Sequence, residues 1–231
     1  MSLLVKICGL STPETLDVAL REGADMVGFV FFPPSPRNIS FETARALASR
    51  VKGKARKVAL TVDAEDALFE AIVEALKPDM LQLHGHETPQ RVAAIRESFG
   101  LPVMKVLPIE SKSDLTAIPK YTGVADRLLF DARPPRDATR PGGLGKPFDW
   151  HLLENLNLSI PFMLAGGVNA GNVAEASSIT KAGGVDVSTG VESAPGVKDP
   201  DKIRAFICAA RAGSPSPLPG GERSTTRSVV G

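Results

Sequence analysis

Two loops late in the chain have the composition of an anion-binding site. Gly166-Gly167 follows the apolar run Ile160–Ala165, and Ser188-Thr189-Gly190 follows the apolar run Val185–Val187. Glycine allows a backbone to turn sharply and to approach a ligand closely, while serine and threonine add hydroxyl donors to the backbone N–H groups. If both runs are strands, two consecutive strand-to-helix loops end in groups that favour a phosphate.

Ionisable side chains stand at the ends of other apolar runs. Cys8 comes directly after Leu3–Ile7, and Asp131 comes directly after Arg127–Phe130. A thiol and a carboxyl group can each take or give a proton, so these residue types suit acid–base chemistry if the fold brings them together. In a closed parallel barrel, the side chains that would converge at one end are Cys8, Arg37, His84, Asp131 and Ser188.

Alternating strands and helices would position these residues. Short apolar runs, each followed by a segment of helical spacing, occur eight times along the chain. The expected strands are Leu3–Ile7, Met26–Phe32, Lys57–Val62, Met80–Leu83, Val103–Val106, Arg127–Phe130, Ile160–Ala165 and Val185–Val187. The expected helices include Phe41–Val51, Ala64–Leu76, Pro89–Phe99, the weaker Leu115–Ile118 and Asp149–Leu156, with Thr12, Ser40 and Asn169 as N-terminal caps.

This order of elements predicts a single-domain α/β protein with the (β/α)8 fold of a TIM barrel. A chain of 231 residues, 43% of them hydrophobic, is long enough to bury one large core. Parallel strands joined by right-handed crossovers can also form an open doubly wound sheet, which is the main alternative. Residues 1–211 are the expected barrel domain. Residues 212–231 are rich in Pro, Gly, Ser, Thr and Arg without apolar periodicity and are expected to form a disordered tail.

Charge and cysteine content restrict the partners. Lys and Arg number 27 against 26 acidic residues, so no basic field indicates nucleic acid or an anionic membrane. No apolar run approaches the roughly 18 residues that would span a bilayer, and the N-terminus does not resemble a signal peptide. Cys8 and Cys208 have no metal-ligand spacing and fit a reducing cytoplasm. We therefore expect a cytoplasmic protein that acts on a small phosphorylated molecule as a monomer or homodimer.

Several segments resemble the phosphoribosylanthranilate isomerase family and occur in that family's order. They are VKICGL (5–10), GADMVGFVFFPPSPRNIS (23–40), LQLHGHE (81–87), LLFDARPP (128–135), GGLGKPFDW (142–150), LAGGVNAGNV (164–173) and GVDVSTGVESAPGVKD (184–199). The resemblance covers roughly residues 3 to 210. It implies a (β/α)8 barrel without a cofactor. It also implies an isomerase that converts N-(5-phosphoribosyl)anthranilate into 1-(2-carboxyphenylamino)-1-deoxyribulose 5-phosphate, by an Amadori rearrangement in tryptophan biosynthesis.

The resemblance further implies roles for individual residues. Cys8 falls on the family's general base, Asp131 on its general acid, and Arg37 on the group that meets the anthranilate carboxylate. The residues that fall on the phosphate site are Gly166, Gly167, Ser188, Thr189 and Gly190. The chemistry agrees with these residue types, because ring opening needs an acid and removal of the C2′ proton needs a base. A thiolate would serve as that base if nearby N–H donors or a cation lowered the pKa of Cys8.

Other interpretations stay open at the level of sequence. Cys8 could be a small buried hydrophobic residue, Asp131 a turn or helix cap, Arg37 a solvated loop charge, and the glycine pairs simple turns. The function could also be that of another sugar-phosphate isomerase or epimerase, although the histidine-pathway isomerase is expected to have a carboxylate in place of Cys8. A non-catalytic phosphate-binding module would need no ionisable residue at Cys8 and Asp131.

Overall fold

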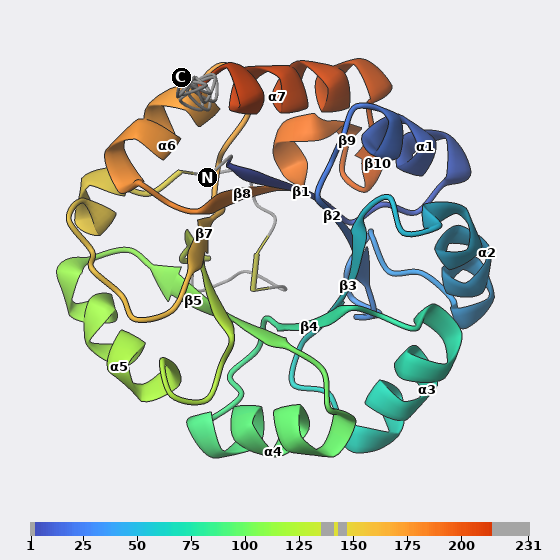
Figure 1. Ribbon diagram of the computed structural model, residues 1–231, viewed down its shortest axis with the longest axis horizontal. Helices are drawn as coiled ribbons and strands as arrows, with labels where there is room; N and C mark the ends of the chain where they lie inside the picture. Colours follow the sequence, from blue (N-terminus) through green and yellow to red (C-terminus); the bar gives the residue numbers. More distant parts are fainter. Residues whose placement is uncertain (1–2, 135–140, 143–146, 214–231) are drawn as a thin grey trace, which may run out of the picture.

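Eight parallel strands close into a barrel, seen end-on in Figure 1, in a computed structural model that describes residues 3–134, 141–142 and 147–213. Each strand pairs with the next in sequence, and β8 returns to pair with β1. Strands β1 to β8 are Leu4–Cys8, Met26–Val30, Arg56–Thr61, Met80–Leu83, Val103–Ile109, Arg127–Ala132, Phe162–Leu164 and Gly184–Val187. The predicted (β/α)8 barrel is confirmed. The doubly wound alternative is wrong, because within the described residues this sheet has no open edge.

Helices surround the barrel on its outside (Figure 1). Helices α1 to α7 are Pro13–Arg21, Phe41–Val51, Asp66–Leu76, Pro89–Phe99, Ile118–Tyr121, Val173–Thr180 and Pro200–Ala212, and the 3₁₀ helix Lys112–Ala117 precedes α5. The predicted caps Thr12 and Ser40 are confirmed, since their side chains accept backbone N–H groups that have no intrahelical acceptor. A hairpin of β9 (Glu192–Ala194) and β10 (Val197–Lys198) lies between β8 and α7.

The segment before β7 differs from the prediction. The sequence suggested a helix over Asp149–Leu156, but the structure has only the short 3₁₀ helix Trp150–Leu153. Asn155 adopts a left-handed backbone with a φ of 66°, a conformation that a right-handed helix cannot continue through. The described part of the link from β6 to β7 therefore provides little helical cover.

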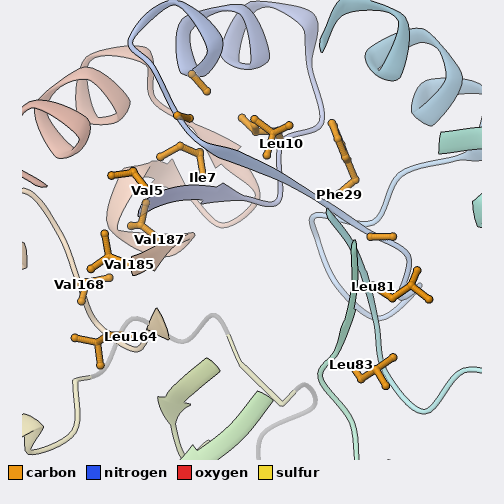
Figure 2. Packing of buried hydrophobic residues seen from close by; sticks show 14 of the residues in the cluster. Val5, Ile7, Leu10, Phe29, Leu81, Leu83, Leu164, Val168, Val185 and Val187 are labelled. Atoms are coloured by element: carbon orange, nitrogen blue, oxygen red, sulfur yellow. The ribbon is translucent and has the colours of Figure 1, made fainter. Parts of the chain in front are cut away.

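The strands separate two layers of buried side chains. Outward-facing residues pack beneath the helices, and Figure 2 shows part of this layer, with Val5 and Ile7 of β1 beside Val185 and Val187 of β8. Inward-facing residues fill the barrel, and this inner cluster is Met26, Val58, Met80, Met104, Val106, Leu129, Met163 and Ala165. Methionine is flexible enough to fill an interior of irregular shape. The inner cluster supports the polar residues nearer the carboxyl ends of the strands.

Aspartates brace the opposite, amino-terminal end of the barrel. Asp25, Asp79 and Asp126 each directly precede a strand and accept a backbone N–H from near the start of the strand before it. The donors are Val5, Lys57 and Val103, at 2.7, 2.7 and 2.9 Å. Because these aspartates precede β2, β4 and β6, alternate strand pairs are aligned by the same interaction.

Arg211 joins the last helix to the amino-terminal end of the barrel. Its guanidinium donates to the carbonyl of Leu3, to the carbonyl of Gly23 at 2.7 Å and to Asp25 Oδ2 at 2.8 Å. Helix α7 continues through Ala212, which the sequence analysis placed in the tail. The rest of the predicted tail, residues 214–231, lies outside the described residues.

Two shortened chains test how the barrel ends. A chain that ends after Gly213 is expected to keep the melting temperature of the full chain, because the composition of residues 214–231 provides little apolar surface for docking. A chain that ends after Ala210 also loses Arg211, and its free energy of unfolding should fall by about 2 kcal/mol. Thermal unfolding followed by circular dichroism compares them. An equal loss in both chains would contradict the expectation, since it would show that the tail docks on the barrel.

Candidate active site

One pocket at the carboxyl ends of the strands is lined by every residue that the sequence analysis assigned to a site. Its empty space, with the solvent at its open mouth included, is about 1130 Å³. The predicted residues in its lining are Cys8, Arg37, Asp131, Gly166, Gly167, Ser188, Thr189 and Gly190. The expected convergence is confirmed, whereas the roles of these residues stay predictions.

Cys8 lies against a buried ion pair. Lys6 of β1 is wholly buried and stands opposite Asp186 of β8, with 2.9 Å between Lys6 Nζ and Asp186 Oδ1. The ammonium of Lys6 also acts electrostatically on the nearby Cys8 thiol, since each group shifts the pKa of the other. Gly28 of β2 leaves the space that this arrangement needs, because a Cβ there would lie 2.9 Å from Cys8 Sγ and 3.0 Å from Lys6 Nζ. A larger residue at position 28 would therefore displace both groups.

Burial has the largest effect on the ionisation of Cys8. It raises the pKa of the thiol above the usual value, while the cationic side chains of Lys6 and Lys198 lower it without reversing the shift. Burial also works against the charge on Lys6, but Asp186 and Cys8 together keep the pKa of Lys6 raised. The cation expected beside Cys8 is present. The expected lowering of the Cys8 pKa is wrong for the protein without substrate, because desolvation outweighs the cation.

Asp131 lies near the end of β6 and is 7% exposed. Its Oδ1 accepts the backbone N–H of Ala132 at 2.8 Å, and its Oδ2 lies 3.4 Å from Nε2 of His84. Gly166 packs closely against Asp131 and Ala132, because a Cβ at its position would lie 2.6 Å from the Ala132 nitrogen and 3.1 Å from Asp131 Oδ1. His84, which the sequence analysis left outside the catalytic set, therefore faces the carboxyl group in the same pocket.

Arg37 is a buried residue rather than a solvated loop charge. It is 4% exposed, and its Nε and Nη2 donate to the two carboxylate oxygens of Glu192 at 2.7 and 2.8 Å. The ammonium of Lys198 lies 2.7 Å from Glu192 Oε1. Burial works to raise the pKa of Glu192, but Arg37 and Lys198 hold that pKa below its usual value. The residue predicted to bind a carboxylate is thus already oriented by a carboxylate of the protein.

The two glycine loops pack against each other. Gly166 and Gly167 have φ values of 78° and 70°, a left-handed backbone that favours glycine. Gly190 is required for another reason, because a Cβ there would lie 2.1 Å from the carbonyl oxygen of Val168 in the neighbouring loop. Behind the loop after β8, Lys198 Nζ donates to the carbonyl oxygen and to the hydroxyl of Ser188, at 2.9 and 3.0 Å.

Asn169 has a different role from the one predicted. It does not cap the next helix, because α6 begins at Val173 after Asn172. The side chain of Asn169 accepts the Gly171 N–H, and Asn172 donates to the carbonyl of Gly167 at 3.1 Å. These bonds compete with helical hydrogen bonding and hold the glycine loop in shape.

Several residues around the pocket were missed in the sequence. Lys6 and Asp186 interrupt apolar runs, and pairing of the first and last strands would have made them partners. Glu192 and Lys198 lie on the very short strands β9 and β10, where the sequence has no periodic apolar pattern. Gln82 of β4 is wholly buried, lines the pocket and has no hydrogen-bond partner for either amide atom among the described residues.

Three further features concern the described residues alone. No group of three or more His, Cys, Asp and Glu side chains is arranged among them to hold a metal ion. None of their helices is both long and apolar enough to cross a membrane. Cys208 of α7 is exposed and unpaired within this part of the chain, in contrast to the buried Cys8.

Comparison of the sequence with known proteins points to one family. Residues 5–209 match the family model described as N-(5′-phosphoribosyl)anthranilate (PRA) isomerase. The N-(5′-phosphoribosyl)anthranilate isomerase of Bradyrhizobium diazoefficiens is 66% identical over 212 residues, which cover 92% of this chain and 95% of that protein. The enzyme of the same description from Nitrobacter winogradskyi is 65% identical over 216 residues, which cover 94% of this chain and 96% of that protein.

Solved structures similar to this one point to the same family. Phosphoribosyl anthranilate isomerase from Thermotoga maritima has a TM-score of 0.80 at 32% identity, covering 91% of this chain and 99% of that one. A phosphoribosyl anthranilate isomerase in complex with reduced 1-(o-carboxyphenylamino)-1-deoxyribulose 5-phosphate has a TM-score of 0.77 at 29% identity, with the same coverage of 91% and 99%. Monomers generated from the dimeric Thermotoga maritima enzyme have a TM-score of 0.77 at 30% identity, again covering 91% and 99%.

Alkylation of Cys8 tests the electrostatics of the pocket. In a Cys208→Ser background, which removes the exposed thiol, the rate of reaction with iodoacetamide should rise with pH to a midpoint above 9.0, the ordinary thiol pKa. Lys6→Met should move the midpoint higher still, because the cation that favours the thiolate is lost. Mass spectrometry of samples quenched across a pH series measures both midpoints. A midpoint below the ordinary value, or no change in folded Lys6→Met, would contradict this account.

Proposed function

Because the chain belongs to the N-(5′-phosphoribosyl)anthranilate isomerase family, and so catalyses the Amadori rearrangement of N-(5-phosphoribosyl)anthranilate in tryptophan biosynthesis, we propose that Cys8 is its general base and Asp131 its general acid. Family membership sets aside the other sugar-phosphate enzymes and the non-catalytic module that the sequence left open. The observation that carries the proposal is that a single pocket is lined by both residues, by Arg37 and by both glycine loops.

Asp131 acts first. It gives a proton to the furanose ring oxygen, the bond from that oxygen to C1′ breaks, and the ring opens to a protonated Schiff base between C1′ and the anthranilate nitrogen. The position of Asp131 supports this role, because the side chain lines the pocket yet is only 7% exposed. His84 Nε2, 3.4 Å from Asp131 Oδ2, is close enough to exchange a proton with it after small movements.

Cys8 then takes the proton from C2′. The electrons of the C2′–H bond form a C1′–C2′ double bond and neutralise the iminium nitrogen, and the resulting enol becomes the ketone as a proton moves from its oxygen to C1′. Since the protonated Schiff base is itself the electron sink, the reaction calls for neither a metal nor pyridoxal. The iminium also places a positive charge near the thiol, which counteracts the burial that raises the Cys8 pKa in the free protein.

The two ends of the substrate are held at different sides of the pocket. Arg37 binds the anthranilate carboxylate, and Gly166, Gly167 and the segment Ser188-Thr189-Gly190 bind the phosphate. The ammonium of Lys198 behind Ser188 adds positive charge to the phosphate end. A related isomerase binds a ligand that carries both a carboxyphenyl group and a phosphate, which supports a site with two anion-binding ends. Fixing both ends aligns C1′ and C2′ with the acid and the base.

Gln82 is an additional substrate contact in this proposal. A wholly buried amide with no partner costs free energy, so the orphaned amide is expected to meet a ligand. A sugar hydroxyl both donates and accepts, which matches the two amide atoms. Gln82 therefore binds a hydroxyl of the sugar chain from the floor of the pocket.

We also propose that the barrel domain, ending with α7, works in the cytoplasm as a monomer or a homodimer. Among the described residues, Val197 is the one large hydrophobic side chain that is strongly exposed, at 54%. Obligate interfaces are large and apolar, so this surface favours a monomer or a modest interface. The dimeric relative from Thermotoga maritima is the reason to retain the homodimer. Analytical ultracentrifugation across protein concentrations distinguishes the two.

Replacement of either proton-transfer residue should stop the chemistry and spare binding. Cys8→Ala and Asp131→Asn are each expected to lower kcat by about 10²- to 10⁴-fold with little change in KM, because each residue acts after the substrate is bound. Cys208→Ser is the matched control and should behave as wild type, since that thiol is exposed on α7. Steady-state kinetics with freshly prepared substrate, and complementation of a tryptophan auxotroph that lacks this isomerase, measure the loss. Wild-type turnover by Cys8→Ser would show that the thiolate is not the base.

The pH dependence gives a second readout of the same assignment. The profile of kcat/KM reports the free enzyme, and that of kcat reports the complex with substrate. Since burial raises the Cys8 pKa in the free protein and the iminium lowers it in the complex, the thiolate limb should lie at lower pH in kcat than in kcat/KM. Identical limbs in the two profiles would contradict the proposed effect of the iminium.

Gln82 and Thr61 make a matched pair for testing the orphaned amide. Both are wholly buried with unpartnered polar atoms among the described residues, but only Gln82 lines the pocket. Gln82→Leu should raise KM on the order of tenfold, because a hydrogen bond to substrate is lost, while Thr61→Val should leave KM unchanged. Equal effects of the two substitutions on KM would refute the proposed contact.

A further inference from the structure

A single buried carboxylate lies between the two ends of the proposed substrate site. Glu192 of β9 holds Arg37 through two hydrogen bonds of 2.7 and 2.8 Å, and it holds Lys198 of β10 at 2.7 Å. The side chains of Arg37, Glu192 and Lys198 are only 5%, 2% and 1% exposed. The three groups therefore form one desolvated network, here called the Arg37–Glu192–Lys198 triad.

Each cation of the triad belongs to one end of the pocket. Arg37 lines the pocket in the loop after β2, where the carboxylate of the substrate is expected. Lys198 holds Ser188, the first residue of the phosphate loop, through both its carbonyl oxygen and its hydroxyl. The triad thus connects two loops that are far apart in the sequence and meet the substrate at opposite ends.

The hairpin of β9 and β10 locks this connection to the loop after β2. Gly196, at the turn of the hairpin, has a φ of 83°, and a Cβ there would lie 2.6 Å from the carbonyl oxygen of Pro36. Its N–H also donates to Glu192 Oε2 at 3.3 Å. Pro36, which precedes Arg37, and Gly196, which donates to Glu192, are therefore closely packed, and neither loop can shift without disturbing the triad.

Stability alone is a weak reason for such a network. Burying ions costs free energy that their mutual attraction does not always repay, and apolar replacements of buried ion pairs are often as stable. A bidentate carboxylate does, however, fix the plane of a guanidinium, which a lone arginine side chain would not maintain. A triad with a net charge of about +1, by the ordinary charges of its groups, also suits a substrate with an anion at each end.

We propose that Glu192 and Lys198 are positioning residues that hold the carboxylate-binding and phosphate-binding ends of the site at a set distance and orientation. Glu192 orients Arg37. Lys198 binds the same carboxylate and also donates to Ser188, so it fixes the phosphate loop relative to Glu192. This inference rests on the proposed roles of Arg37 and the phosphate loops. Its consequence is that removing the triad's central carboxylate weakens binding at both ends, although Glu192 itself touches neither end of the substrate.

Substitutions at the triad, read as a split between KM and kcat, test the proposal. Glu192→Gln should raise KM and the inhibition constant of inorganic phosphate each on the order of tenfold, with a smaller fall in kcat. Lys198→Met should raise the inhibition constant of phosphate. Lys198→Arg, which keeps a cation, should raise that constant less than Lys198→Met does. Arg211→Met is the control, because it breaks an arginine–carboxylate contact at the opposite end of the barrel and should lower stability without changing KM.

A pH series provides an independent measurement if Glu192→Gln does not fold. Burial lowers the pKa of Lys198 to about 8, and the charged or titratable groups that face it are Glu192, Arg37 and Cys8. The measurement uses a Cys8→Ser background, because serine does not titrate in this range. Affinity for reduced 1-(o-carboxyphenylamino)-1-deoxyribulose 5-phosphate should weaken as pH rises through about 8, where Lys198 loses its proton. With Lys198→Arg added, affinity should stay constant over the same range, because arginine keeps its charge.

The outcomes separate this inference from the proposed function. If Arg37→Ala raises KM but folded Glu192→Gln does not, the positioning role is wrong and the proposed function stands. If Arg37→Ala itself leaves KM unchanged, the proposed carboxylate-binding role fails. A pH dependence of affinity that is the same with lysine and with arginine at position 198 would also overturn the inference, since the charge of Lys198 would then have no effect on binding.

Discussion

The pairing of β1 with β8 is the contact on which the site depends. It closes the barrel with Lys6 directly opposite Asp186, and their side chains form an ion pair 2.9 Å long inside it, between residues 180 positions apart in the sequence. Two residues after Lys6 comes Cys8, and two after Asp186 comes Ser188. The same pairing that removes the sheet edges therefore places the proposed base beside the proposed phosphate loop.

The functional residues follow the strands around the barrel in an orderly way. The proposed acid lies on β6, the phosphate loops follow β7 and β8, the proposed base ends β1, and Arg37 lies in the loop after β2. The phosphate end is thus flanked by acid on one side and base on the other. Strand β4 contributes from across the barrel, where Gln82 and His84 are two residues apart and both line the pocket.

Buried charges support several of these positions from behind. Lys6 and Asp186 stand beneath Cys8, while Glu192 and Lys198 stand behind Arg37 and Ser188. A third set lies after β4, where Lys105 donates to Glu87 and to the carbonyl of Gly85, next to His84. Because buried ion pairs contribute little net stability, their common position behind pocket residues agrees better with orientation of the site than with stabilisation of the fold.

The sequence by itself determined the order of the strands, the barrel and part of the lining of its pocket, because apolar periodicity and small-residue loops are local signals. The family motifs around Cys8, Asp131 and the glycine loops extended those signals to a function. Predictions from local signals were wrong at two places where contacts with other residues determine the backbone. Asn169 shapes a loop instead of capping α6, and the helix expected over Asp149–Leu156 is a short 3₁₀ helix. Only the tertiary structure decided that burial outweighs the cation beside Cys8 and that Arg37 is held by Glu192. Both are consequences of desolvation and of contacts between distant segments, which no stretch of sequence contains alone.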